Sequence, residues 1–175
     1  MLFRSAGEAA RGEAGIIRLA RRVIEIWALL GGVVLLGIAV MSTWSATSGF
    51  LFGKPLPGDF EMVEVLVAVA AFAFLPYCQI TDANVTADIF TARASRRTIA
   101  VFGLLAGIVA LAIAALLLWR MSAGLQDYRQ YVETTAILKF PIWIAYIPAL
   151  VSLFLLTVAC VITLKDAARE FVRPS

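Results

Sequence analysis

Few side chains in this sequence could catalyse a reaction or hold a cofactor. The chain has no histidine and only two cysteines, Cys78 and Cys160. Without histidine there is no imidazole ligand for haem, copper or zinc, and two cysteines are too few for an iron–sulfur cluster. We therefore expect no catalytic residue, no metal site and no cofactor. Both cysteines are interpreted as small apolar packing residues, with a redox role as the alternative.

The two carboxylates best placed for a functional contact are Glu61 and Glu64, which stand at the start of a long apolar stretch. Residues three apart share one face of a helix, and Ala68 and Ala71 continue that face as a stripe of small residues. One interpretation is an ionic or hydrogen-bonded contact with a partner subunit. The other is that acidic residues favour a helix amino terminus because of the helix dipole.

The elements that position these residues must be membrane helices. The chain has 175 residues, of which 62% are hydrophobic, and its mean hydropathy is +0.91. These values are outside the range of soluble domains and indicate a protein with several membrane spans. The apolar runs are unbroken and lack the alternation of barrel strands, so the spans are helices. The net charge of +3 is interpreted as a topology signal, and no nucleic-acid partner is expected.

Four spans are predicted. The clearest is 98–119, which holds 22 residues without a charge and would extend about 33 Å as a helix, enough for a hydrocarbon core of about 30 Å. The first span, near 24–45, overlaps the uncharged run 26–53, which is too long for the apolar region of a secretory signal peptide. The others are 60–80, where Pro76 predicts a kink, and 141–164, where Pro148 predicts a bend. The fold class is all-α: an integral membrane four-helix bundle forming a single domain over 1–175.

The amino-terminal segment 1–22 carries five arginines. On a helical projection Arg11, Arg18 and Arg22 lie opposite an apolar side that includes Ala20 and Ile24. This pattern predicts an amphipathic helix on an anionic membrane surface before the first span; a frayed, solvated terminus is the alternative. Further membrane-surface candidates are the aromatic residues Trp27 and Trp143.

Charge counts in the segments between spans predict the topology. Of the 15 Lys and Arg residues, 11 fall in the amino terminus, the second loop and the carboxyl-terminal tail, and four in the first and third loops. By the positive-inside rule, both termini are cytoplasmic and the first and third loops face outward.

The connecting segments suggest further contacts. Residues 81–97 are expected to include a short interfacial helix. The third loop, Met121–Phe140, is long for a simple connection and is a candidate binding surface, with Leu125, Tyr128 and Val132 at helical spacing. In span three, Gly103 and Gly107 predict close helix contact, either within the chain or with another subunit.

The order of these parts resembles the DctQ-like small membrane subunit of tripartite ATP-independent periplasmic (TRAP) transporters. The resemblance depends on four spans with both ends inside, on the acidic start of span two, and on two motifs, NVTADI at 84–89 and LKFPIWIAYIP at 138–148, the latter preceded by Glu133 and Thr134. It extends over about residues 20–165, and the last motif is the most specific. The sequence departs from the family at Ala83 and Asn84, where a basic residue or histidine often precedes the valine.

The resemblance implies a scaffold role in the bacterial inner membrane. In such transporters a large subunit carries the substrate and sodium sites and moves, while a soluble periplasmic protein delivers the substrate, for example an organic acid. The small subunit would be non-catalytic, would stabilise the large subunit and would help to dock the binding protein. The candidates for contact with the large subunit are Glu61, Glu64, Gly103 and Gly107. Those for docking of the binding protein are Tyr128, Arg129, Tyr131 and Glu133.

Two other functions are open at this point. One is the membrane anchor of a haem-free respiratory enzyme, since bis-histidine haem is excluded. The other is a self-assembling small-solute channel, although no charged residue lies near the middle of any predicted span, where ion pathways usually have polar groups.

Overall fold

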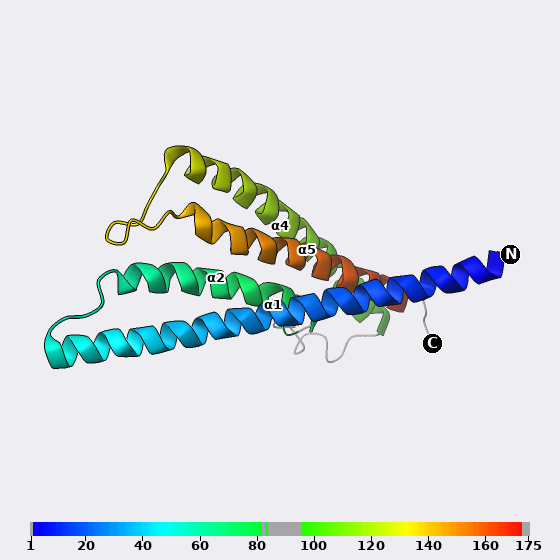
Figure 1. Cartoon of the computed structure of the whole chain (residues 1–175). Coiled ribbons are helices and arrows are strands. Elements are labelled where there is room, and N and C mark those ends of the chain that lie inside the picture. Colours follow the sequence, from blue (N-terminus) through cyan, green and yellow to red (C-terminus); the bar gives the residue numbers. More distant parts are fainter. Residues whose placement is uncertain (1, 82, 84–95, 173–175) are drawn as a thin grey trace.

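The computed structural model describes residues 2–81, 83 and 96–172, and these form four long helices (Figure 1). They are α1 (Leu2–Phe52), α2 (Asp59–Ile80), α4 (Arg96–Tyr131) and α5 (Trp143–Val172). Each contains a stretch that is long and apolar enough to cross a membrane. The prediction of an all-α membrane protein with four spans is confirmed. Most of the segment predicted to hold an interfacial helix, and the motif at 84–89, lie outside the described residues.

Helix α2 coincides with the predicted span 60–80. It follows Gly58, whose φ of 75° is in the left-handed region that glycine adopts without a Cβ clash. Helix α1 contains the predicted span 24–45, but it begins at Leu2 and shows no sharp bend in Figure 1. The amino-terminal segment is thus helical as predicted, and it continues the direction of the first span instead of forming a separate helix.

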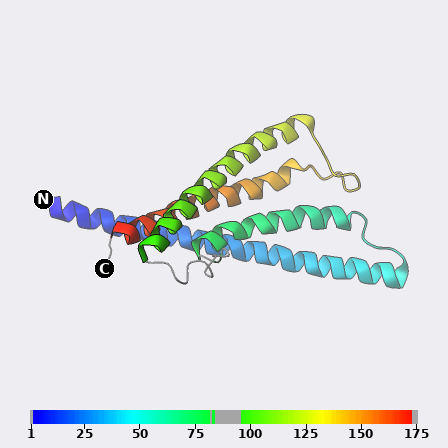
Figure 2. The same ribbon diagram turned by 180° about the vertical axis from the view of Figure 1, so that it is seen from behind.

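The four helices pack in the order α1, α2, α5, α4. Extensive contacts join α1 to α2, α2 to α5 and α5 to α4, with a smaller contact between α1 and α5. Figures 1 and 2 show the two hairpins converging where α5 ends and spreading apart toward the opposite end. We call the spreading end, which carries residues 53–58 and 132–142, the loop end, and the other the termini end. The helices therefore form an open layer rather than a closed bundle.

The core at the termini end joins three helices. Ile24 of α1, Ile80 of α2 and Ile162 of α5 are buried together with Ala159. Ala20 belongs to the apolar side predicted for the amino-terminal segment, and it packs against this cluster. The apolar side of the amino-terminal segment therefore packs against other helices and contributes to the smaller contact between α1 and α5.

Small residues let neighbouring helices approach closely. A Cβ added to Gly31 would lie 2.9 Å from the Cβ of Ala73, so α1 and α2 nearly touch there. Between α4 and α5, a Cβ on Gly107 would lie 3.0 Å from Leu164, and Ala114 is fully buried. This close approach is the packing mode expected of membrane helices, in which small residues increase van der Waals contact.

The third connection differs from the prediction. Met121–Phe140 was expected to be a long loop, but α4 continues to Tyr131 and the connection comprises only residues 132–142. The helix continues because its last three turns pack on α5: Gly124 lies against the ring of Tyr146, and Tyr128 stacks with the same ring. Val132, predicted to share the helical spacing, has a φ of 48° and lies just beyond the helix end.

Candidate functional site

The connection 132–142 folds into a compact hairpin at the loop end. Thr134 and Pro141 form an antiparallel bridge, and the N–H of Ile142 donates to the carbonyl of Glu133 at 3.1 Å. Thr135 closes the turn by making two hydrogen bonds with Phe140. Its N–H donates to the carbonyl of Phe140 at 2.9 Å, and its hydroxyl accepts from the N–H of Phe140 at 3.0 Å. The backbone groups of this polar segment are thus largely satisfied within the hairpin.

Glu61 fastens this hairpin to α2. Its two carboxylate oxygens accept hydrogen bonds from the N–H groups of Ile137, at 2.7 Å, and Leu138, at 3.0 Å. The Leu138 side chain occupies the space where a Cβ of Gly58 would lie, so only glycine fits at that position. Bonds to an ionised acceptor are stronger than those between neutral groups. Glu61 therefore holds together two segments 76 residues apart in sequence.

A cleft of about 490 Å³ lies beside the hairpin, and we call it the loop-end cleft. Helix α2 forms one wall, α4 the other and α5 the floor, while the hairpin closes it at the loop end. Most of its surface is apolar. Its lining residues are Glu61, Glu64, Val65, Ala68, Val69, Phe72, Met121, Tyr128, Thr135, Ala136, Ile142, Ala145, Tyr146 and Ala149.

Glu64 faces this cleft without a partner. Among the described residues it makes no hydrogen bond and no ion pair, and its side chain is exposed. Glu64 is thus available to an external group, whereas the oxygens of Glu61 are engaged by the hairpin. The sequence placed the two residues on one face but could not distinguish these roles.

Aromatic contacts join α4 to α5 at the loop end. The ring centroids of Tyr128 and Tyr146 are 5.0 Å apart with planes inclined at 40°, and the guanidinium carbon of Arg129 lies 5.4 Å from the ring centroid of Trp143. The latter distance is within the range of a cation–π contact. Tyr131 is 72% exposed. The structure therefore brings the four predicted docking residues to one end of the molecule. Tyr128 and Arg129 are held by ring contacts, the backbone of Glu133 belongs to the hairpin, and Tyr131 is exposed.

The comparison with known families agrees with this architecture. A family model described as "Tripartite ATP-independent periplasmic transporters, DctQ component" matches residues 38–170, well over half of the chain. The chain belongs to the DctQ family. DctQ proteins are components of a tripartite transporter that also contains a large membrane subunit and a substrate-binding protein. No similar sequence was found among curated proteins.

The two glycines predicted to mark a helix interface have different surroundings in this DctQ chain. Gly107 faces α5, where a Cβ would meet Leu164. Gly103 has nothing within 4 Å of such a Cβ, so it leaves an open position on α4. The GxxxG pair thus contributes one residue to packing within the chain and leaves the other to the surface.

The membrane-surface candidates are also divided. Arg18 and Arg22 are exposed near the termini end, and the side chain of Arg11 lies outside the described residues. The indole N–H of Trp27 points into the protein, where it donates to the hydroxyl of Ser152 at 2.9 Å. Ser152 in turn donates to the carbonyl of Pro148 at 2.8 Å, so the Trp27 contact continues to the backbone of α5.

A third arginine, Arg21, forms an exposed ion pair of 3.3 Å with Asp166, which sequence reasoning did not find. The sequence offered one signal for this pair: the amino-terminal segment is basic, and an acidic residue follows the fourth span. The pair joins α1 to α5 beside the buried cluster at the termini end.

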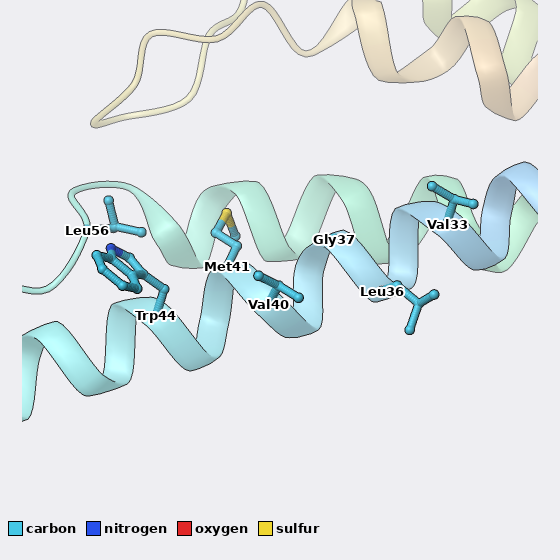
Figure 3. A pocket seen from close by; sticks show the side chains of 7 residues that line it. All are labelled: Val33, Leu36, Gly37, Val40, Met41, Trp44 and Leu56. Atoms are coloured by element: carbon cyan, nitrogen blue, oxygen red, sulfur yellow. The ribbon is translucent and has the colours of Figure 1, made fainter.

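A second concavity runs along the half of α1 nearer the loop end and is almost wholly apolar (Figure 3). It encloses about 590 Å³ and is lined by Val33, Leu36, Gly37, Val40, Met41, Trp44 and Leu56. These side chains can meet lipid or another helix, and the indole N–H of Trp44 is the one polar side-chain group among them. Within the described part of the chain, no three His, Cys, Asp or Glu residues are grouped as a metal site would require.

Proposed function

We propose that this DctQ protein is the static, non-catalytic subunit of a sodium-driven transporter for organic acids in the bacterial inner membrane. It stabilises the large transport subunit within the bilayer and helps to receive the substrate-binding protein. In this proposal both termini are cytoplasmic, as the distribution of Lys and Arg predicts, and the loop end faces the periplasm.

The open layer of helices is the observation that supports this proposal most strongly. In the most apolar stretch of α4 only 6% of the residues are buried, against 33% in α5. Helix α4 therefore packs on one neighbour and presents most of its surface outward, with exposed side chains such as Phe102, Leu105, Val109 and Ile113. A subunit that widens a membrane scaffold needs such a surface, because its partner helices must pack against it.

The fixed hairpin supports the docking role. Residues 132–142 are fastened to α2 by Glu61, and the bridge between Thr134 and Pro141 holds the hairpin in shape, so they present a defined surface at the loop end. Rigid surfaces bind with a smaller loss of conformational entropy than mobile ones. We assign docking to Tyr128, Arg129, Tyr131 and Glu133 beside this hairpin.

Four residues are assigned to the interface with the large subunit, two by direct contact and two by positioning the segments beside it. In the isolated chain, the side chain of Glu64 and the surface at Gly103 are accessible to a partner subunit. Glu61 and Gly107 act from within, because Glu61 fixes the hairpin next to the cleft and Gly107 sets the position of α4 on α5.

Co-expression with the cognate large subunit tests the assembly role. The two chains should co-purify in a 1:1 ratio, and the large subunit expressed alone should be less stable to heat. Purification of a fully stable large subunit without this chain would contradict the proposal. For docking, Tyr131→Ala should weaken binding of the substrate-binding protein to the purified complex, while Tyr77→Ala, an exposed tyrosine near the opposite end of α2, should leave it unchanged.

A further inference from the structure

The loop-end cleft has the chemistry to receive one particular kind of side chain. Its surface is mostly apolar, and the small residues Ala68, Ala145 and Ala149 in its lining leave room for a long side chain. The carboxylate of Glu64 is its uncommitted polar group among the described residues, and the negative charge of Glu61 lies one turn away. The ring of Tyr128 on α4 and the ring of Tyr146 on α5 also line the cleft.

The charge of the cleft lining indicates which kind of side chain it can receive. An anionic group would meet two carboxylates, and a purely apolar group would leave Glu64 without an ionic or hydrogen-bonding partner. A cationic side chain would pair with Glu64 and place its charge near the faces of aromatic rings, which attract cations. The cleft is therefore complementary to lysine or arginine.

The position of the cleft decides where this side chain comes from. Glu64 lies five residues after the start of α2, about 7.5 Å along the helix, and the hairpin lies between it and the loop end. Approach from the water beyond the loop end is thus obstructed by residues such as Thr135 and Ala136. A neighbouring membrane helix that packs on the helix layer would reach the cleft from the side.

We propose that the loop-end cleft receives a lysine or arginine side chain from a membrane-spanning segment of the large transporter subunit, which forms an ion pair with Glu64. This inference rests on the proposed function and assigns a contact chemistry within it. The pair would set the register between the two subunits, because a single buried charge pair fits one relative position of two helices.

The test uses the complex of this chain with its large subunit. The isosteric variant Glu64→Gln should weaken assembly about 10-fold, and Glu64→Lys about 100-fold, since truncating one partner of a desolvated charge pair costs far more than losing an exposed one. Ala68→Phe, which fills the cleft without changing its charge, should also weaken assembly. The matched control is Glu25→Lys, an exposed carboxylate at the other end of the molecule, which should assemble normally.

Each outcome decides the proposal. A charge-reversed lysine or arginine in the large subunit that restores assembly of Glu64→Lys would establish the pair. Unchanged affinity of Glu64→Gln, with the unvaried complex assembling normally, would overturn it. Native mass spectrometry that finds an amine-headgroup lipid lost from Glu64→Gln, with assembly intact, would assign the cleft to lipid and overturn it as well. If the unvaried chains fail to co-purify, the proposed function itself fails.

Discussion

The contact between Gly31 and Ala73 gives the sharpest stability prediction. A Cβ on Gly31 would lie 2.9 Å from the Cβ of Ala73, whereas carbon atoms prefer about 3.5–4.0 Å. Neither atom can rotate away, because each is attached directly to its helix backbone. Gly31→Ala therefore forces α1 and α2 apart by roughly 0.6 Å or more, and overpacking of this kind costs about 1–3 kcal/mol.

The neighbouring Gly32 provides a matched control. A Cβ there has nothing within 4 Å, so Gly32→Ala adds no clash. Both substitutions gain the same helix propensity, up to about 1 kcal/mol. The difference in unfolding free energy between the two variants should therefore equal the packing cost, about 1–3 kcal/mol in favour of Gly32→Ala.

Unfolding in mixed micelles of mild detergent and dodecyl sulfate, followed by tryptophan fluorescence, measures this difference. In a background carrying Ala73→Gly, the substitution Gly31→Ala should lose its cost, because the opposing Cβ is absent. Equal stability of Gly31→Ala and Gly32→Ala, or a cost that persists in the Ala73→Gly background, would refute the packing of α1 on α2 described above.

Three further predictions concern polar contacts. Trp27→Phe, which keeps the apolar bulk but removes the donor to Ser152, should destabilise the protein by about 0.5–1.5 kcal/mol in the same unfolding assay; no change would mean that the hydrogen bond is absent. Glu61→Gln should increase hydrogen exchange at the amides of residues 137–138 without changing exchange in the middle of α2, and equal protection would contradict the fastening of the hairpin. Arg21→Gln removes an exposed ion pair between α1 and α5 and should change stability by less than about 1 kcal/mol; a larger loss would show that the pair is more buried than described.

The spans were predictable because the bilayer imposes a simple requirement. Apolar runs of about 20 residues with little or no charge are needed to cross it. The run 98–119 in α4 has no charge, and the run 60–80 in α2 has only Glu61 and Glu64, both at its start. Length and charge alone therefore identified the helices. The end of α4 was missed because Arg120 and Asp127 break the apolar pattern, while the helix is continued by contacts with a ring on α5 that is distant in sequence.

The arrangement of the helices and the partners of individual side chains could not be predicted in the same way. Apolar side chains are satisfied equally by lipid and by protein, so the sequence does not specify which helices are neighbours. The carboxylate of Glu61 accepts bonds from backbone groups of a hairpin 76 residues away, and a backbone donor has no sequence signature. Trp27 resembled an interfacial anchor because its hydrogen-bond acceptor, Ser152, lies on another helix.

The central claim is that this chain supports a transporter without conducting a solute itself. Reconstitution into lipid vesicles tests it most directly, with sodium-driven uptake measured for the large subunit and binding protein in the presence and absence of this chain. We expect uptake only when all three components are present, and no sodium or organic-acid flux from this chain alone. Robust flux through vesicles that contain only this chain would contradict the account.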